Sequence, residues 1–170
     1  MNKALGLRPY QKISKMNSKI AVKNLLAHWD AQRYLRVPQG ISSQEIGLFA
    51  EDKGINIPIE FADYLRSANG FGIGDTESSL ASSDDEGFEF YALSKQKIIG
   101  SGYLVFCGWP YGFIEYAICA TNSEKNGIVV QLIDDDRGYF LAKDFSEFIS
   151  LYLEDSSRLY APGTEVVALK

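Results

Sequence analysis

The fold is decided by residues 40–70, GISSQEIGLFAEDKGINIPIEFADYLRSANG. Ser42 with Glu45 three residues later is a capping-box pattern, in which each side chain accepts a hydrogen bond from the other residue's backbone N–H. Apolar residues at helical spacing follow, and Lys53 with Gly54 is typical of a helix C-terminus. We therefore expect an amphipathic helix that begins after Ser42 and ends before Gly54.

We expect one more helix on each side of this one. Pro58 stands where a helix can begin, and apolar residues recur after it until Asn69 and Gly70, where we expect that helix to end. Upstream, Ser18 is a candidate N-cap for a helix over residues 19–35, whose apolar residues follow mostly helical spacing. This part of the chain thus predicts three helices.

The second half of the chain predicts strands and a closing helix. Short aromatic or β-branched segments, bounded by Gly, Pro, Asn or Asp, occur at residues 88–93, 103–109, 113–121, 127–133 and 139–142. Asp144 then caps a helix whose apolar stripe is formed by Phe145, Phe148, Ile149, Tyr152 and Leu153. The prediction is an α+β fold, in which N-terminal helices and one C-terminal helix flank one face of an antiparallel sheet of about five strands.

Charge is divided unevenly along the chain. Residues 1–37 hold eight basic residues and one acid, a net charge of +7, whereas residues 38–170 hold nine basic and 21 acidic residues, a net charge of −12. We expect one structural domain, with a basic helical extension at 1–37, a main domain at 38–160 and a tail at 161–170. The acidic body favours a basic partner and disfavours nucleic acid and anionic membrane. The basic segment either docks on this body or contacts a partner.

The chain offers little equipment for catalysis. His28 is its single histidine, and the sequence indicates no carboxylate that would orient it as a general base. Cys107 and Cys119 lie in apolar, aromatic-rich runs, which indicates burial and not a disulfide framework or a zinc site. We therefore expect no catalytic residue, no metal and no cofactor.

Partner binding has three candidate surface features. They are an acidic run at Asp84, Asp85 and Glu86, the aromatic residues Trp109 and Tyr111 beside a Gly/Pro-rich turn, and the acids Asp134, Asp135 and Asp136. The last three do not fit the ligand spacing of a calcium loop, so we interpret them as an exposed hairpin turn. Carboxylates would steer a basic partner and aromatic anchors would hold it. Alternatively, the acids only keep the protein soluble and the aromatic rings pack against the helices.

The order of Ile57-Pro58, Tyr64 and Asn69-Gly70 resembles the opening of SUKH domains, the superfamily named after Smi/Knr-type fungal cell-wall regulators and related proteins. Ile57 stands where members commonly have Leu. The later layout of strands, turn and final helix is also similar, and the resemblance spans residues 40–155. It implies an α+β fold and, in bacteria, a frequent role as an immunity protein that blocks a polymorphic toxin, often a nuclease. Fungal relatives resemble signalling scaffolds. The resemblance transfers no binding residue to this chain.

The leading hypothesis is therefore a non-enzymatic, cytoplasmic immunity protein that neutralises a cognate toxin or another protein with a basic surface, and that binds neither nucleic acid nor membrane. A regulatory scaffold with cellular protein partners is the alternative. A small-ligand binder or a hydrolase is a third class, and it would need a deep pocket with convergent polar groups.

Overall fold

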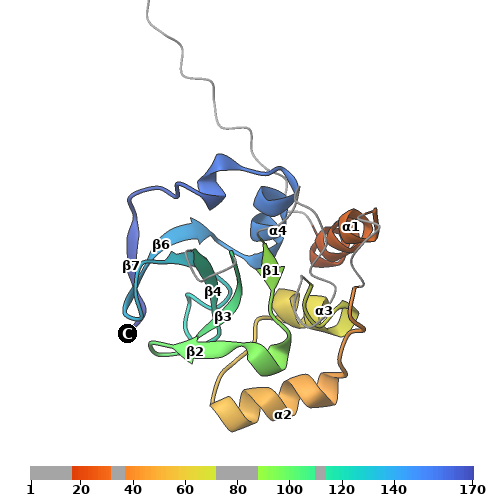
Figure 1. Cartoon of the computed structure of the whole chain (residues 1–170). Helices are drawn as coiled ribbons and strands as arrows, with labels where there is room; N and C mark the ends of the chain where they lie inside the picture. Colours follow the sequence, from red (N-terminus) through yellow and green to blue (C-terminus); the bar gives the residue numbers. More distant parts are fainter. Residues whose placement is uncertain (1–16, 32–36, 72–87, 110–113) are drawn as a thin grey trace, which may run out of the picture.

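The structure is a computed structural model, which describes residues 17–31, 37–71, 88–109 and 114–170 (Figure 1). Its helices are α1 (Ser18–Ala31), α2 (Ser43–Lys53), α3 (Ile59–Ser67) and α4 (Phe145–Leu153), with short 3₁₀ turns η1 (Leu93–Lys95) and η3 (Ser157–Leu159). Its strands are β1 (Glu89–Phe90), β2 (Lys97–Ile99), β3 (Tyr103–Gly108), β4 (Glu115–Cys119), β5 (Val129–Leu132), β6 (Arg137–Ala142) and β7 (Val166–Ala168). The predicted α+β class is confirmed.

The strands form one antiparallel sheet in the order β1-β3-β4-β5-β6-β7. β2 pairs with the first half of β3, where Ile99 lies opposite Tyr103, and β1 pairs with its end, where Phe90 lies opposite Cys107. The described residues thus contain seven strands instead of about five. The five expected strands are present as β1 and β3 to β6, and the two additional ones, β2 and β7, have three residues each.

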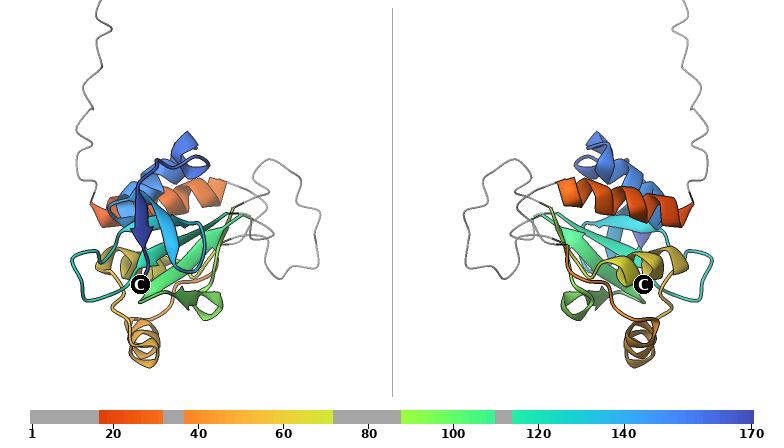
Figure 2. Two further views of the ribbon diagram at one scale, coloured as in Figure 1. Left: turned by 90° about the vertical axis from the view of Figure 1, so that its left-hand side faces the viewer. Right: turned by 90° about the vertical axis from the view of Figure 1, so that its right-hand side faces the viewer.

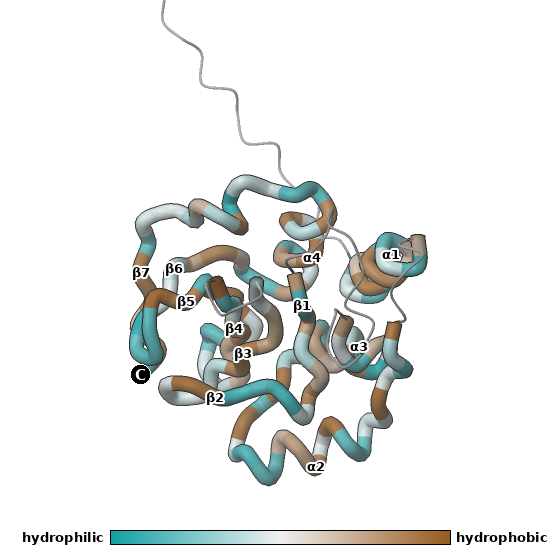
Figure 3. The backbone as a smooth tube through the Cα atoms, in the orientation of Figure 1, coloured by the Kyte–Doolittle hydropathy of each residue, from teal (hydrophilic) through white to brown (hydrophobic). Residues whose placement is uncertain are grey.

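The capping signals of α2 are confirmed. The Ser42 hydroxyl accepts a hydrogen bond from the Glu45 N–H, and the Glu45 carboxylate accepts one from the Ser42 N–H at 2.8 Å. Gly54 closes the helix with a left-handed φ of 65°. Ile46 is its one buried residue, and its hydrophobic middle lies between two hydrophilic ends (Figure 3). α2 is therefore a peripheral helix whose ends are fixed by local hydrogen bonds.

The start of α1 differs from the expectation by one residue. Asn17 precedes the helix, and its carbonyl oxygen accepts hydrogen bonds from the N–H groups of Ile20 and Ala21. Ser18 is already helical, and its hydroxyl donates to Asp63 on α3 at 3.1 Å. A side chain that bonds across to another helix is thus not available to cap its own, and Asn17 takes that place.

One face of the sheet is covered by α1, α3 and α4, as expected. Figure 2 shows α1 and α4 side by side, with α2 at the far side of the molecule from them. The buried rings of Phe61, Phe106 and Phe148 meet at this interface, where Phe106 lies 5.4 Å from Phe61 and 5.0 Å from Phe148. Trp29 of α1 stacks on Phe71 at 4.3 Å. The aromatic side chains thus bind helices and sheet into one core.

The second face of the sheet is covered by the end of the chain, in the segment that the sequence left as a tail. Val167 and Leu169 pack there with Tyr103 and with mostly aliphatic residues of the other strands. The Leu169 carbonyl oxygen accepts a hydrogen bond from the Ser101 N–H at 2.6 Å, which ties the last residues to the turn between β2 and β3. Gly100 is required in that turn, because its φ is 54° and a Cβ would lie 2.0 Å from the Leu169 carbonyl oxygen.

Asn69 and Gly70 do not terminate α3 as expected. The helix ends at Ser67, and Ala68 is already extended, with a φ of −153°. The Asn69 side-chain oxygen instead accepts a hydrogen bond from the Leu93 N–H at 2.8 Å, which caps η1 from 24 residues away. Gly70 has a φ of 96° and leaves no room for a Cβ beside the Ala92 backbone. The pair therefore joins α3 to the sheet edge.

Candidate functional site

The strand register brings the described candidate residues to one end of the sheet. β3 and β5 are both antiparallel to β4, so their C-terminal ends lie on the same side. Trp109 follows β3 there, and the acids from Asp134 follow β5. Phe88 precedes β1 at the same end, with its ring 5.5 Å from that of Trp109. We call this region, defined by Phe88, Trp109 and Asp134 to Asp136, the acidic end.

Trp109 belongs partly to the core and partly to the surface. Its half-buried ring contacts the rings of Phe88 and Tyr160, each at 5.5 Å. Its backbone N–H donates to the Ile114 carbonyl oxygen at 2.8 Å, which fixes its position at the strand end. The indole is therefore held by packing and remains partly exposed, although its Nε1 is buried. Tyr111 lies outside the described residues.

The acids after β5 form the exposed turn to β6, and two of them are paired. Asp134 accepts hydrogen bonds from Arg137 Nη2 at 2.6 Å and Nε at 3.0 Å, and these bonds lower the pKa of its carboxyl. Asp136 forms an ion pair with Lys170 at 3.1 Å. Asp135 is exposed and has no ion pair among the described residues. Arg137 and Lys170 thus offset part of the negative charge of this turn.

The acidic run at Asp84, Asp85 and Glu86 lies outside the described residues. The described chain resumes at Phe88, which is part of the acidic end. Those three acids are thus two to four residues from Phe88 in the sequence. The topology places the other candidate residues near this point of the chain.

The motif residues Ile57, Pro58 and Tyr64 serve the fold. Pro58 is buried at the N-cap of α3, and its carbonyl oxygen accepts a hydrogen bond from the Ala62 N–H at 2.9 Å. Ile57 is half-buried and packs against the core. Tyr64 is fully buried among aromatic rings, and burial raises the pKa of its hydroxyl far above the ordinary value. These residues fix the start of α3 and pack in the core.

The titratable residues expected to be structural are not gathered in a site. His28 is half-buried on α1, with its ring edge-on to Tyr152 at 5.7 Å. Cys107 and Cys119 are buried and not disulfide-bonded, and burial raises the pKa of the Cys107 thiol well above its ordinary value. Within the described ranges, no group of three His, Cys, Asp or Glu residues is placed to hold a metal ion.

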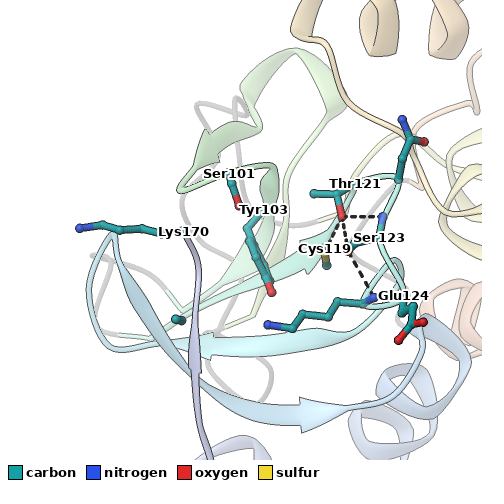
Figure 4. Close-up of a pocket in the computed structure, with 10 residues that line it drawn as sticks. Ser101, Tyr103, Cys119, Thr121, Ser123, Glu124 and Lys170 are labelled. Carbon is teal, nitrogen blue, oxygen red and sulfur yellow. Dashed lines mark hydrogen bonds between the residues drawn. The ribbon is translucent and has the colours of Figure 1, made fainter.

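A pocket lies on the sheet face away from α1, α3 and α4, and the sequence did not predict it (Figure 4). It has a volume of about 630 Å³ and is bordered by the turn before β3, the loop after β4 and the end of the chain. Its lining residues are Ser101, Tyr103, Cys119, Thr121, Asn122, Ser123, Glu124, Lys125, Ala168 and Lys170. The polar residues after Cys119 were the one local signal for this pocket. The position of β7 opposite this loop, which encloses the space, cannot be read from the sequence.

Comparison with known proteins identifies the family. Residues 40–151 match the SMI1 / KNR4 family (SUKH-1). The chain belongs to this family. A search of curated proteins gave no match. The family match begins after α1 and ends within α4, so α1 and β7, which both complete the packing of this SUKH-1 domain, lie outside it. None of the helices in the described ranges is long and apolar enough to span a membrane.

Proposed function

We propose that this SUKH-1 protein is a non-enzymatic protein-binding module that acts as an immunity protein and neutralises a cognate toxin. The family match over residues 40–151 carries the proposal. A toxin with a basic surface fits best, and nucleases are the toxin class in which such a surface is expected, because they bind phosphate. The proposed location is the cytoplasm, where buried thiols such as those of Cys107 and Cys119 stay reduced.

The charge of the body supports a basic partner. Residues 38–170 carry a net charge of −12, and a surface potential of one sign accelerates encounter with a surface of the opposite sign. Five of these charges come from acids in residues 72–87, which contain no basic residue. The described chain resumes after this segment at Phe88, which belongs to the acidic end.

The acidic end also offers a fixed aromatic group. Trp109 is held between Phe88 and Tyr160, so little side-chain entropy would be lost when a partner covers its exposed part. Rigid aromatic anchors surrounded by charged residues are typical of tight protein interfaces. We therefore propose the acidic end as the partner surface, with Asp84, Asp85, Glu86 and Tyr111 as further contributors.

A non-enzymatic role agrees with the chemistry of the described residues. A general base needs an orienting group within hydrogen-bond reach, and a nucleophilic thiol needs a lowered pKa. His28 lies against the ring of Tyr152, and the thiol of Cys107 has a raised pKa. The raised pKa keeps the Cys107 thiol protonated, and a protonated thiol is a poor nucleophile.

Calorimetry with the toxin domain encoded beside this chain tests the proposal. We expect a one-to-one complex. Its association rate, followed by stopped-flow mixing, should fall when Asp84, Asp85 and Glu86 are changed to Asn, Asn and Gln. The matched control changes Glu51, Asp52 and Glu165 to Gln, Asn and Gln, which removes the same charge away from the acidic end. Equal slowing by both variants would contradict the proposed surface, and absence of a complex at low salt would contradict the toxin partner.

The alternative is a regulatory scaffold of the Smi/Knr type, the group after which the family is named. A scaffold predicts stable complexes with several cellular proteins and no protection against a toxin. Affinity purification from cells, followed by a protection assay with the neighbouring toxin domain, separates the two functions.

A further inference from the structure

The pocket beside β7 contains a buried polar group without a strong partner. Tyr103 is 2% exposed, and its hydroxyl has no oxygen or nitrogen hydrogen-bond partner among the described residues. The nearby Cys119 sulfur is only a weak acceptor. Figure 4 shows the ring reaching from β3 between Lys170 and the loop that carries Thr121 and Ser123. A buried hydroxyl without a strong partner costs stability. Unlike the Tyr64 hydroxyl in the core, that of Tyr103 belongs to the lining of an open pocket, where a ligand can supply the missing acceptor.

Hydrogen-bond donors are in excess around Tyr103. The Cys119 sulfur lies 3.4 Å from the Thr121 hydroxyl oxygen, which lies 2.7 Å from the Ser123 hydroxyl oxygen. These three groups carry three protons, and the two hydrogen bonds between them use two. In either direction of these two hydrogen bonds, one of the three protons has no acceptor among Cys119, Thr121 and Ser123. With the Tyr103 hydroxyl, two donors therefore await an acceptor.

Lys125 adds a positive charge to the same pocket. It lines the pocket and has no ion pair among the described residues, whereas Lys170 is paired with Asp136. Figure 4 shows the Glu124 carboxylate turned away from the Tyr103 hydroxyl. Burial, followed by the nearby Cys119 thiol, raises the pKa of Tyr103, so its hydroxyl keeps its proton at physiological pH. Spare donors and an unpaired lysine together select a ligand that accepts hydrogen bonds and carries negative charge.

We propose that this pocket binds a small oxyanion, a carboxylate or phosphate group, through the Tyr103 hydroxyl and the Lys125 ammonium. The loop of this site follows β4, at the opposite end of that strand from Trp109, while Lys170 in the other wall reaches the acidic end through its ion pair with Asp136. The site also needs the end of the chain, because Ala168 and Lys170 form one wall. Residues outside the family match therefore complete the site.

Amide NMR titrations with inorganic phosphate and, separately, with succinate test the proposal on the full chain. We expect saturable shifts at Ser101, Tyr103, Thr121 and Lys125. Tyr103→Phe and Lys125→Gln should each weaken binding about tenfold or more, the affinity equivalent of one charge-assisted hydrogen bond. Saturation by one probe alone assigns the ligand to that class.

Two controls separate binding from general effects. Lys143→Gln removes an exposed lysine outside the pocket, and Tyr64→Phe removes a buried hydroxyl on the other face of the sheet. Both should bind the probe as the unmodified chain does, and Tyr103→Phe should keep or raise the melting temperature. Absence of shifts with both probes throughout the millimolar range, or equal weakening by Lys125→Gln and Lys143→Gln, would overturn the proposal.

Discussion

The two faces of the sheet bury side chains of different kinds. Under α1, α3 and α4, aromatic rings such as Phe106 and Phe148 interlock with helix residues, and the Tyr116 hydroxyl donates to the Leu159 carbonyl oxygen at 2.6 Å. Under β7, mostly aliphatic side chains surround Tyr103, whose hydroxyl has no oxygen or nitrogen partner among the described residues. Because the Tyr64 hydroxyl on the helix-covered face also has no partner, the faces differ in packing and access: interlocked rings hold the fold on one face, and the other borders a pocket that a ligand can enter.

The largest effect is expected from removing a ring on the helix-covered face. Phe148 is fully buried and contacts the rings of Phe106 and Tyr116, so Phe148→Ala should lower the free energy of unfolding by about 3–5 kcal/mol. Val167→Ala, at the opposite face, should cost about 2 kcal/mol or less, because Val167 is smaller and 9% exposed. Urea denaturation measures both. Equal losses of unfolding free energy would contradict the proposed difference between the two faces.

The next largest effect on stability is expected at the seam between α3 and the sheet edge, which we define by the hydrogen bond between Asn69 and Leu93. Asn69→Ala removes the acceptor for the Leu93 N–H, and it should lower the free energy of unfolding by about 1–2 kcal/mol. Asn122→Ala is the matched control, since this exposed side chain should change stability by no more than about 0.5 kcal/mol. A loss no larger than the control's would show that Asn69 does not hold the seam.

Two tyrosine substitutions, one on each face of the sheet, should differ in the sign of their effect on the free energy of unfolding. Tyr116→Phe removes a made hydrogen bond and should lower the free energy of unfolding by about 1 kcal/mol. Tyr103→Phe removes a hydroxyl without a strong partner and should leave stability unchanged or raise it by up to about 1 kcal/mol. Thermal unfolding in buffer without phosphate or carboxylates checks both. Destabilisation by Tyr103→Phe would mean that its hydroxyl is satisfied within the protein.

The smallest effect concerns α2, which is outside the main contacts of both faces. Hydrogen bonds from the Ser42 side chain and then from its backbone lower the pKa of Glu45. A lowered folded-state pKa gives stability that is present at neutral pH and is lost as the pH falls through that pKa. Glu45→Gln should therefore be less stable than the unmodified chain at about pH 7, and the difference should be smaller at about pH 3. Urea titrations at the two pH values measure it, and a pH-independent difference would contradict the linkage.

Local signals made the helices of this protein predictable. The limits of α2 follow from Ser42, Glu45 and Gly54, and the hydrogen bonds confirm them. Asp144 likewise caps α4 by accepting from the Glu147 N–H at 2.8 Å. Such contacts lie within four residues, so the sequence displays both partners together. The family resemblance, which rests on Ile57 to Gly70, was confirmed over residues 40–151.

Long-range contacts explain what the sequence could not show. Asn69 looked like a helix stop, but its partner Leu93 is 24 residues away. β7 has three residues and is defined by its register with β6, so its hydropathy alone gives no signal. The pocket joins Tyr103 to Lys170 through that strand and was therefore missed. Likewise, Trp109 and Asp134 share an end of the sheet only through the pairing of β3, β4 and β5.

The central claim, a binding module that neutralises a toxin, is tested most directly by titrating this chain into the toxin domain encoded beside it while the toxin's own activity is followed. The account predicts that activity falls in proportion to the added chain and vanishes at one equivalent, without turnover of the toxin or of its substrate by this chain. Full toxin activity in the presence of excess chain would contradict the account.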